Sequence, residues 1–147
     1  MVRTARTRRE DTPVKAALNQ GEHGTLEVSE ESAAGLADLD GFDYAWLGLA
    51  DRAGEQPLPL TQVPFLLKHD PRRIGMFATR SPRRINPIGL SLVRVLDVSG
   101  STVRFAGVDL VDGTSIIDLK PYVPAFGRPP GAPRSGWIAP LVLEEGV

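Results

Sequence analysis

The chain has 147 residues, no cysteine, two histidines and a formal net charge of −1. These totals fit a single domain, exclude disulfides and thiolate chemistry, and argue against a structural zinc site, so we expect no bound metal. No apolar run approaches the ~18 residues that span a bilayer, and the basic N-terminus lacks the apolar segment of a secretory signal. We therefore expect a cytoplasmic protein that does not enter a membrane.

The charges are segregated along the chain although the net charge is small. Nine acidic residues and one basic residue, Arg52, lie between Glu22 and Glu55, whereas five arginines and no acid lie between Arg72 and Arg84. A nearly neutral protein with a concentrated basic face can still bind a polyanion there.

The first half of the chain predicts short strands and one short helix. Residues 25–28 alternate between polar and apolar side chains, which indicates a strand. Ser29 is placed to cap a short helix that ends near Gly41. Residues 42–49 carry aromatic side chains at alternate positions, at Phe42, Tyr44 and Trp46, and predict a second strand, and residues 65–69 predict a third.

The second half predicts a meander of three strands. They span residues 90–98, 102–110 and 115–120, and the turns between them fall at Ser99-Gly100 and Asp112-Gly113. After this meander the prolines exclude a long helix, and the indole of Trp137 is expected to pin the tail by becoming buried.

These elements predict the fold class. Many short strands with Gly/Pro turns favour a mainly β protein: a single closed or nearly closed antiparallel β-barrel with one short helix and an irregular C-terminal tail. A doubly wound sheet would need alternating helices, which the pattern lacks. No Gly-x-Gly-x-x-Gly motif opens a helix either, so the common nucleotide-binding fold is not available.

Residues 78–90 form the most informative segment, since they place three arginines among turn residues. Arg80, Arg83 and Arg84 offer forked donors that suit carboxylates and phosphates. The prolines of this segment restrict the backbone, which predicts a stiff loop that presents guanidinium groups. The alternative is an arginine-rich loop that is merely solvated.

Two long segments carry a resemblance to a known family. Residues 75–91, with Phe77-Ala78-Thr79-Arg80-Ser81-Pro82 at their centre, resemble the signature of the TsaA-like (TrmO) family, and residues 109–124 resemble its second signature. Members of this family are S-adenosylmethionine-dependent methyltransferases that act on N6 of threonylcarbamoyladenosine, next to the tRNA anticodon. The resemblance implies that residues 1–147 form a single TsaA-like β-barrel domain, that S-adenosylmethionine and tRNA bind to it, and that it forms a homodimer.

The resemblance also implies residues that bind the cofactor. Arg80 would clamp the carboxylate of S-adenosylmethionine, Leu90 would pack on the cofactor, and the carboxylates of Asp109 and Asp112 would accept ribose hydroxyls or offset the sulfonium charge. A core position explains Leu90 equally well, and the Asp112-Gly113 turn needs no ligand. The full predicted cofactor set is Ala16, Ala17, Leu18, Arg80, Leu90, Asp109, Leu110, Asp112 and Gly113.

A second group of residues is predicted to bind the tRNA. Arg83 and Arg84 would contact phosphates, and Asn86 would orient the loop or contact a base edge. Lys120 would pair with the substrate anion, and Tyr122 would stack on a base, although a core aromatic is the alternative for Tyr122. No catalytic residue is identified, and Asp112 and Asp118 are the candidates for the base that removes a proton from the acceptor nitrogen.

The chain departs from the family pattern at several positions. Lys15 replaces a glutamine, Asp51-Arg52 stands where a histidine is usual, Ile85 and Ser115 each replace a proline, and residues 1–4 resemble the end of the first strand, so we expect a late start. One alternative is therefore a catalytically lapsed paralogue that binds S-adenosylmethionine or RNA without methyl transfer. Another is an RNA-binding barrel that uses only its arginine loop.

Overall fold

The main element of the structure, a computed structural model, is an antiparallel sheet of six strands in the order β1-β2-β7-β6-β3-β8. The structure describes residues 1–8, 19–50, 59–67 and 70–144. The chain divides into two compact units, Met1–Leu58 with Pro82–Tyr122 and Pro59–Ser81 with Val123–Val147. The sheet belongs to the first unit, and its strands are β1 (Val2–Arg3), β2 (His23–Glu27), β3 (Tyr44–Ala50), β6 (Ile88–Ser99), β7 (Thr102–Ala106) and β8 (Ser115–Pro121).

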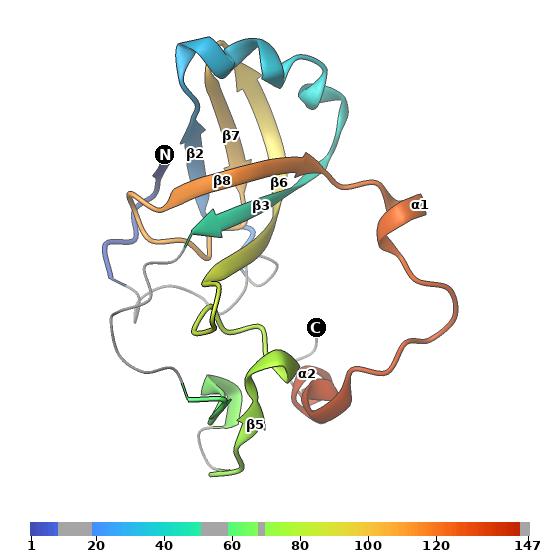
Figure 1. Cartoon of the computed structure of the whole chain (residues 1–147). Coiled ribbons are helices and arrows are strands. Elements are labelled where there is room, and N and C mark those ends of the chain that lie inside the picture. Colours follow the sequence, from blue (N-terminus) through green and yellow to red (C-terminus); the bar gives the residue numbers. More distant parts are fainter. Residues whose placement is uncertain (9–18, 51–58, 68–69, 145–147) are drawn as a thin grey trace. The chain divides into compact units, whose positions relative to one another are not determined.

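The long strand β6 joins the two halves of this sheet. Its residues from Ile88 to Arg94 pair with β3, and those from Arg94 to Ser99 pair with β7. The register with β7 shifts between Val95 and Asp97, and a bulge of this kind bends a strand and increases its twist. β3 and β8 accordingly run steeply across the direction of β2 and β7 (Figure 1).

The core of the first unit lies on one face of the sheet because alternate strand residues are apolar. Val2, Leu26 and Val103 stand opposite one another on β1, β2 and β7, and each is at most 2% exposed. Leu47 of β3 and Val93 of β6 belong to the same buried cluster. Burying a side chain of this size contributes about 1.5–3 kcal/mol. The core therefore determines which side chains of each strand point to the opposite, outer face.

The predicted mainly β fold is confirmed, but the expected closed barrel is not formed. β1 and β8 stand at the two edges of the sheet, and within the described residues no ladder joins them. Val2 N donates to Thr114 O (3.1 Å), and Gly113 N donates to Val2 O (2.9 Å), so the two edges are linked at the turn before β8. Because β1 has two residues and β8 has seven, β1 is too short to extend this link into a ladder.

Two 3-10 helices, η3 (Glu30–Leu36) and η4 (Leu39–Gly41), replace the predicted single helix. They lie at one end of β2, β7 and β6 (Figure 1). Leu36 and Leu39 are 7% and 5% exposed and belong to the core. Asp38 between them has a φ of 64°, and this left-handed conformation interrupts the helix.

The predicted meander is formed only in part: β6 and β7 pair as a hairpin, but β8 pairs with β3 and not with β7. β7 also ends earlier than the predicted strand 102–110. Gly107 has a φ of 88°, and its N–H donates to Glu22 O (3.1 Å), which takes the chain out of the ladder. Residues 107–114 therefore form a connection rather than a strand.

The second unit consists of short elements. β4 (Thr61–Gln62) pairs with β5 (Ile74–Gly75). The others are the 3-10 helices η5 (Phe65–Leu67), η6 (Met76–Ala78) and η7 (Gly136–Ile138) and the helices α1 (Pro124–Gly127) and α2 (Ala139–Glu144). No helix in the described part of the chain has the length and hydropathy needed to cross a membrane.

Two expectations for this unit are corrected, and one is confirmed. The strand predicted over 65–69 is a 3-10 helix at Phe65–Leu67, in which Leu67 N donates to Pro64 O (2.9 Å), and residues 68–69 lie outside the described residues. The tail is less irregular than expected, because it contains α1 and α2. The half-buried indole of Trp137 does hold the tail, since Nε1 donates to Ala78 O (2.7 Å).

Candidate functional site

The acidic candidates lie on the connection between β7 and β8. Val108 and Leu110 are 0% and 3% exposed, so they anchor this segment in the core. Asp109 between them is half-buried, and Asp112 is exposed at the turn where Gly113 has a φ of 79°. The two buried neighbours hold Asp109 on a fixed backbone, and the turn that follows them carries Asp112.

Asp109 is positioned by a serine of the neighbouring strand. The Oγ of Ser91, on β6, donates to Oδ1 of Asp109 at 2.6 Å, and Ser91 is 3% exposed. A short hydrogen bond to a carboxylate is stronger than one between neutral groups. Sequence reasoning did not select Ser91, although a polar residue at an inward position of an apolar strand indicates a buried hydrogen-bond partner.

Asp112 ties the turn to the N-terminal strand. Its Oδ1 accepts a hydrogen bond from Thr4 N at 3.0 Å, and its Oδ2 lies 3.7 Å from Nη1 of Arg3. The Thr4 hydroxyl donates to Leu110 O at 3.1 Å and holds the same segment from a second point. These partners come from the far end of the chain, so local sequence patterns could not reveal them. Asp112 thus has a structural role in addition to its predicted cofactor role.

Other candidates lie on the outer face of β6, β3 and β8. Leu90, Gly48 and Asp118 form one row across the three strands, and because adjacent strand residues point to opposite faces, Leu90 points away from buried Ser91. Leu90 is 59% exposed, so the core position that was its alternative explanation is wrong. Leu90 thus lies on the outer face of β6, whereas Asp109 is bound by Ser91, which points to the opposite face.

The next row on this face carries Lys120. Its Nζ lies 2.7 Å from Oδ2 of Asp118. The hydrogen bond from Lys120, together with its positive charge, lowers the pKa of Asp118. The ring of Tyr122 packs edge-to-face against Trp46, with centroids 6.2 Å apart and planes at 73°. Tyr122 is half-buried at the rim of the sheet and is not a core aromatic.

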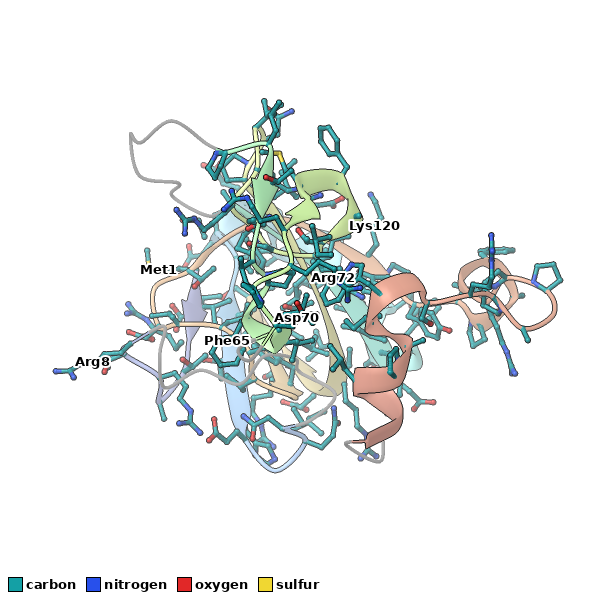
Figure 2. The ribbon with its side chains drawn as sticks, turned by 90° about the horizontal axis from the view of Figure 1, so that it is seen from below. Met1, Arg8, Phe65, Asp70, Arg72 and Lys120 are labelled. Carbon is teal, nitrogen blue, oxygen red and sulfur yellow. The ribbon has the colours of Figure 1, made fainter. Side chains whose placement is uncertain are left out.

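The arginine-rich stretch divides between the two units. Arg72 and Arg73, in the second unit, are held locally: Arg72 pairs with Asp70 (3.6 Å), a pair labelled in Figure 2, and Arg73 donates to the hydroxyl and carbonyl of Thr61 (2.9 and 2.5 Å). Arg80 of this unit is exposed and follows Thr79, which is 7% exposed. Arg72 and Arg73 are therefore structural arginines.

The first unit contains the rest of the signature. Arg83 and Asn86 are exposed and Arg84 is half-buried. Ile88 N donates to Asn86 O (2.7 Å), which forms a tight turn directly before β6. The segment thus leads into the strand that carries Leu90 and Ser91.

Several predicted features lie outside the described residues. They include the cofactor candidates Ala16, Ala17 and Leu18 and the departures Lys15 and Asp51-Arg52. Among the described residues, no group of three or more acidic or histidine side chains could hold a metal ion.

Comparison with known proteins identifies the family. The profile described as the tRNA-methyltransferase O N-terminal domain matches residues 1–128. A Pyrococcus abyssi protein named a probable S-adenosyl-L-methionine-binding protein is 38% identical over 129 residues, which is 87% of this chain and 67% of that protein. A tRNA (adenine(37)-N6)-methyltransferase of Eikenella corrodens is 38% identical over 109 residues, 70% of this chain and 61% of that enzyme.

A solved structure agrees with these relatives. The crystal structure of TrmO from Pseudomonas aeruginosa superposes with a TM-score of 0.74 at 28% identity, and the match covers 90% of this chain and 56% of that one. The chain thus spans between about half and two thirds of the length of these relatives. The profile match and the archaeal relative show that this chain belongs to the tRNA-methyltransferase O N-terminal domain family.

Proposed function

We propose that this protein is an S-adenosylmethionine-dependent tRNA methyltransferase that methylates N6 of threonylcarbamoyladenosine next to the anticodon. The observation that carries the proposal is the family match over residues 1–128, which includes both sequence signatures. Relatives named as S-adenosyl-L-methionine-binding proteins and as tRNA (adenine(37)-N6)-methyltransferases support the cofactor and the substrate.

The side chains present fit the chemistry of this cofactor. Asp109 is a half-buried carboxylate that Ser91 holds in place, so it can face a cation or ribose hydroxyls without first being ordered. Arg80 has the guanidinium fork that matches a carboxylate. When bound, S-adenosylmethionine supplies a methyl group on a sulfonium. The protein's task is to orient donor and acceptor in line and at near-attack distance.

The remaining predicted residues have roles on the tRNA side. Arg83 and Arg84 bind phosphates, which positions the anticodon loop but reads no sequence. Asn86 contacts a base edge, Lys120 pairs with the carboxylate of the modified adenosine, and Tyr122 stacks on a neighbouring base. Asp112 and Asp118 are the candidates for the base that takes the proton from the acceptor nitrogen, and Lys120 lowers the pKa of Asp118.

The decisive experiment is mass spectrometry of nucleosides from tRNA that carries threonylcarbamoyladenosine, incubated with the protein and S-adenosylmethionine. We expect a methylated form of this nucleoside that is absent without the protein. If no methylated nucleoside forms, calorimetry with the cofactor alone shows whether the protein still binds S-adenosylmethionine. Heat of binding without methylation identifies the lapsed paralogue, and no heat at millimolar cofactor rejects the proposal.

Two variants test the cofactor residues. Arg80→Ala should weaken cofactor binding by about 1.5–3 kcal/mol, the value of a charge-assisted hydrogen bond. Ser91→Ala should weaken it less, because the Asp109 carboxylate remains but loses its positioning bond. Unchanged affinity in both variants would remove Arg80 and Asp109 from the cofactor site.

We also propose that the protein acts as a homodimer. Light scattering after size-exclusion chromatography should give about twice the mass of the 15.9 kDa chain. A monomer at concentrations where methylation is full would reject this part of the proposal.

A further inference from the structure

β1, β2 and β7 are neighbours at one edge of the sheet, and their outer face carries a row of polar side chains. Thr25 of β2 stands opposite Arg3 of β1 and Arg104 of β7. The neighbouring row, Val2, Leu26 and Val103, fills the core, so Arg3, Thr25 and Arg104 must all point outward. Two guanidinium groups therefore flank a short threonine side chain.

This row borders an open groove of about 290 Å³. The volume is at the lower limit of the ~300–1,000 Å³ of sites for drug-sized molecules, so the groove suits a small group. Its lining contains two arginines and no acidic residue, and consists of Arg3, Thr4, Ala5, His23, Gly24, Thr25 and Arg104.

Most of the polar side chains in the groove have no partner inside the protein. Over the described ranges, the Arg104 guanidinium, the Thr25 hydroxyl and the His23 imidazole make no hydrogen bond or ion pair. Arg3 has one long ion pair, 3.7 Å from Nη1 to Oδ2 of Asp112, which leaves most of its donors for a ligand. Asp97 stands opposite Arg104 on β6, yet no ion pair joins them there.

We propose that this groove binds one phosphate group of an RNA backbone, held by Arg3 and Arg104 from two sides and by the Thr25 hydroxyl from below. The identification of RNA rests on the proposed function. A planar guanidinium fork matches two phosphate oxygens, and a hydroxyl can donate to a third. Because the groove is open, a continuous strand can pass through it, and the contact adds affinity and orientation without reading sequence.

The test is fluorescence anisotropy of labelled tRNA without cofactor, over a series of salt concentrations. Arg104→Gln should bind about tenfold more weakly at low salt, and the slope of log affinity against log salt should fall by about 1, as for one lost phosphate contact. Asp97→Asn should bind severalfold more tightly, because it removes the carboxylate that stands opposite Arg104 on β6. The matched control is Arg94→Gln, which removes one positive charge at an exposed position of β6 that does not line the groove.

A double variant tests whether both arginines hold the same phosphate. Arg3→Gln combined with Arg104→Gln should lose less affinity than the two single losses multiplied, because the second arginine acts on a contact that is already weakened. Multiplicative losses would mean two separate phosphates and would overturn a single site.

Three other outcomes would overturn the inference. If Arg104→Gln binds tRNA with wild-type affinity, the groove is not a phosphate site. If Arg94→Gln loses as much affinity as Arg104→Gln, the effect comes from the overall positive charge of the protein and not from this groove. If inorganic phosphate shifts the backbone amide signals of Gly24 and Thr25 in NMR spectra but RNA does not, the groove is a free-phosphate site. Since no cofactor is present, a protein that binds tRNA in this way but methylates nothing would contradict the proposed function and leave this inference standing.

Discussion

At the scale of single residues, Asp118 and Lys120 form the best-defined ion pair on the outer face of β8. The two groups are 2.7 Å apart, and the hydrogen bond from Lys120 lowers the pKa of Asp118 from its ordinary value of 3.8. A lowered carboxyl pKa stabilises the fold above the ordinary value, and this contribution disappears as the pH falls through the lowered one. Lys120→Gln should raise the pKa of Asp118 toward 3.8, measured by NMR titration of the carboxyl carbon. An unchanged titration would show that solvent already screens the pair.

Gly24 is tightly restricted by its surroundings. A Cβ added there would lie 2.7 and 2.9 Å from ring atoms of Phe105, which is 0% exposed and cannot move aside. Overpacking of this kind costs about 1–3 kcal/mol, so Gly24→Ala should lower the free energy of unfolding by that amount in urea. The control is Gly21→Ala, where a Cβ meets nothing within 4 Å, and its stability should stay within about 0.5 kcal/mol. Equal stability of the two variants would contradict this packing.

The sequence identified acidic residues of the candidate site but not the groups that hold them. Asp109 and Asp112 were found through the family signature. Of their partners, Ser91 lies on β6, Arg3 on β1 and Thr4 directly after β1, and only the assembled sheet brings these residues together.

At the scale of elements, period-two alternation predicted the strands that have one buried face. β3 and β8 begin and end within two residues of the predicted strands, and β6 begins two residues earlier than predicted. The strand predicted over residues 65–69 was wrong because a short apolar run does not distinguish a strand from a turn of helix. The local sequence does not predict the bend of β6 at Val95–Asp97 either. The bend arises because the first half of β6 pairs with β3 and the second half pairs with β7.

Among the described residues, a side-chain hydrogen bond of Trp137 holds the C-terminal segment of the second unit. Trp137→Phe keeps most of the ring burial but removes the bond from Nε1 to Ala78 O, at a cost of about 1 kcal/mol. We expect faster cleavage by trypsin after Arg134, which is exposed and is followed by Ser135. The first unit lacks this contact, so cleavage in β6 and β7 should not change. Equal acceleration at all sites would mean that the substitution destabilises the whole protein.

At the scale of the whole molecule, the two units differ in how much structure holds each of them. The second unit combines residues 59–81 with 123–147. Local patterns could not predict this division, because no linker or change of composition separates the two units along the chain. The first unit has a six-stranded sheet over one continuous core, whereas the only ladder described in the second joins two strands of two residues each.

This difference predicts unequal local stability, which native-state hydrogen exchange can measure. Amides in the ladders of β3, β6 and β7 should exchange several orders of magnitude more slowly than those of β4 and β5, because central strands open only when the core is exposed, whereas a two-residue ladder opens locally. Low concentrations of urea should accelerate the exchange of the central strands strongly and that of β4 and β5 hardly at all, since only the first opening exposes a large surface. Equal protection and equal urea dependence in the two units would instead mean that they unfold as one cooperative structure, with β4 and β5 stabilised by much more than their own hydrogen bonds.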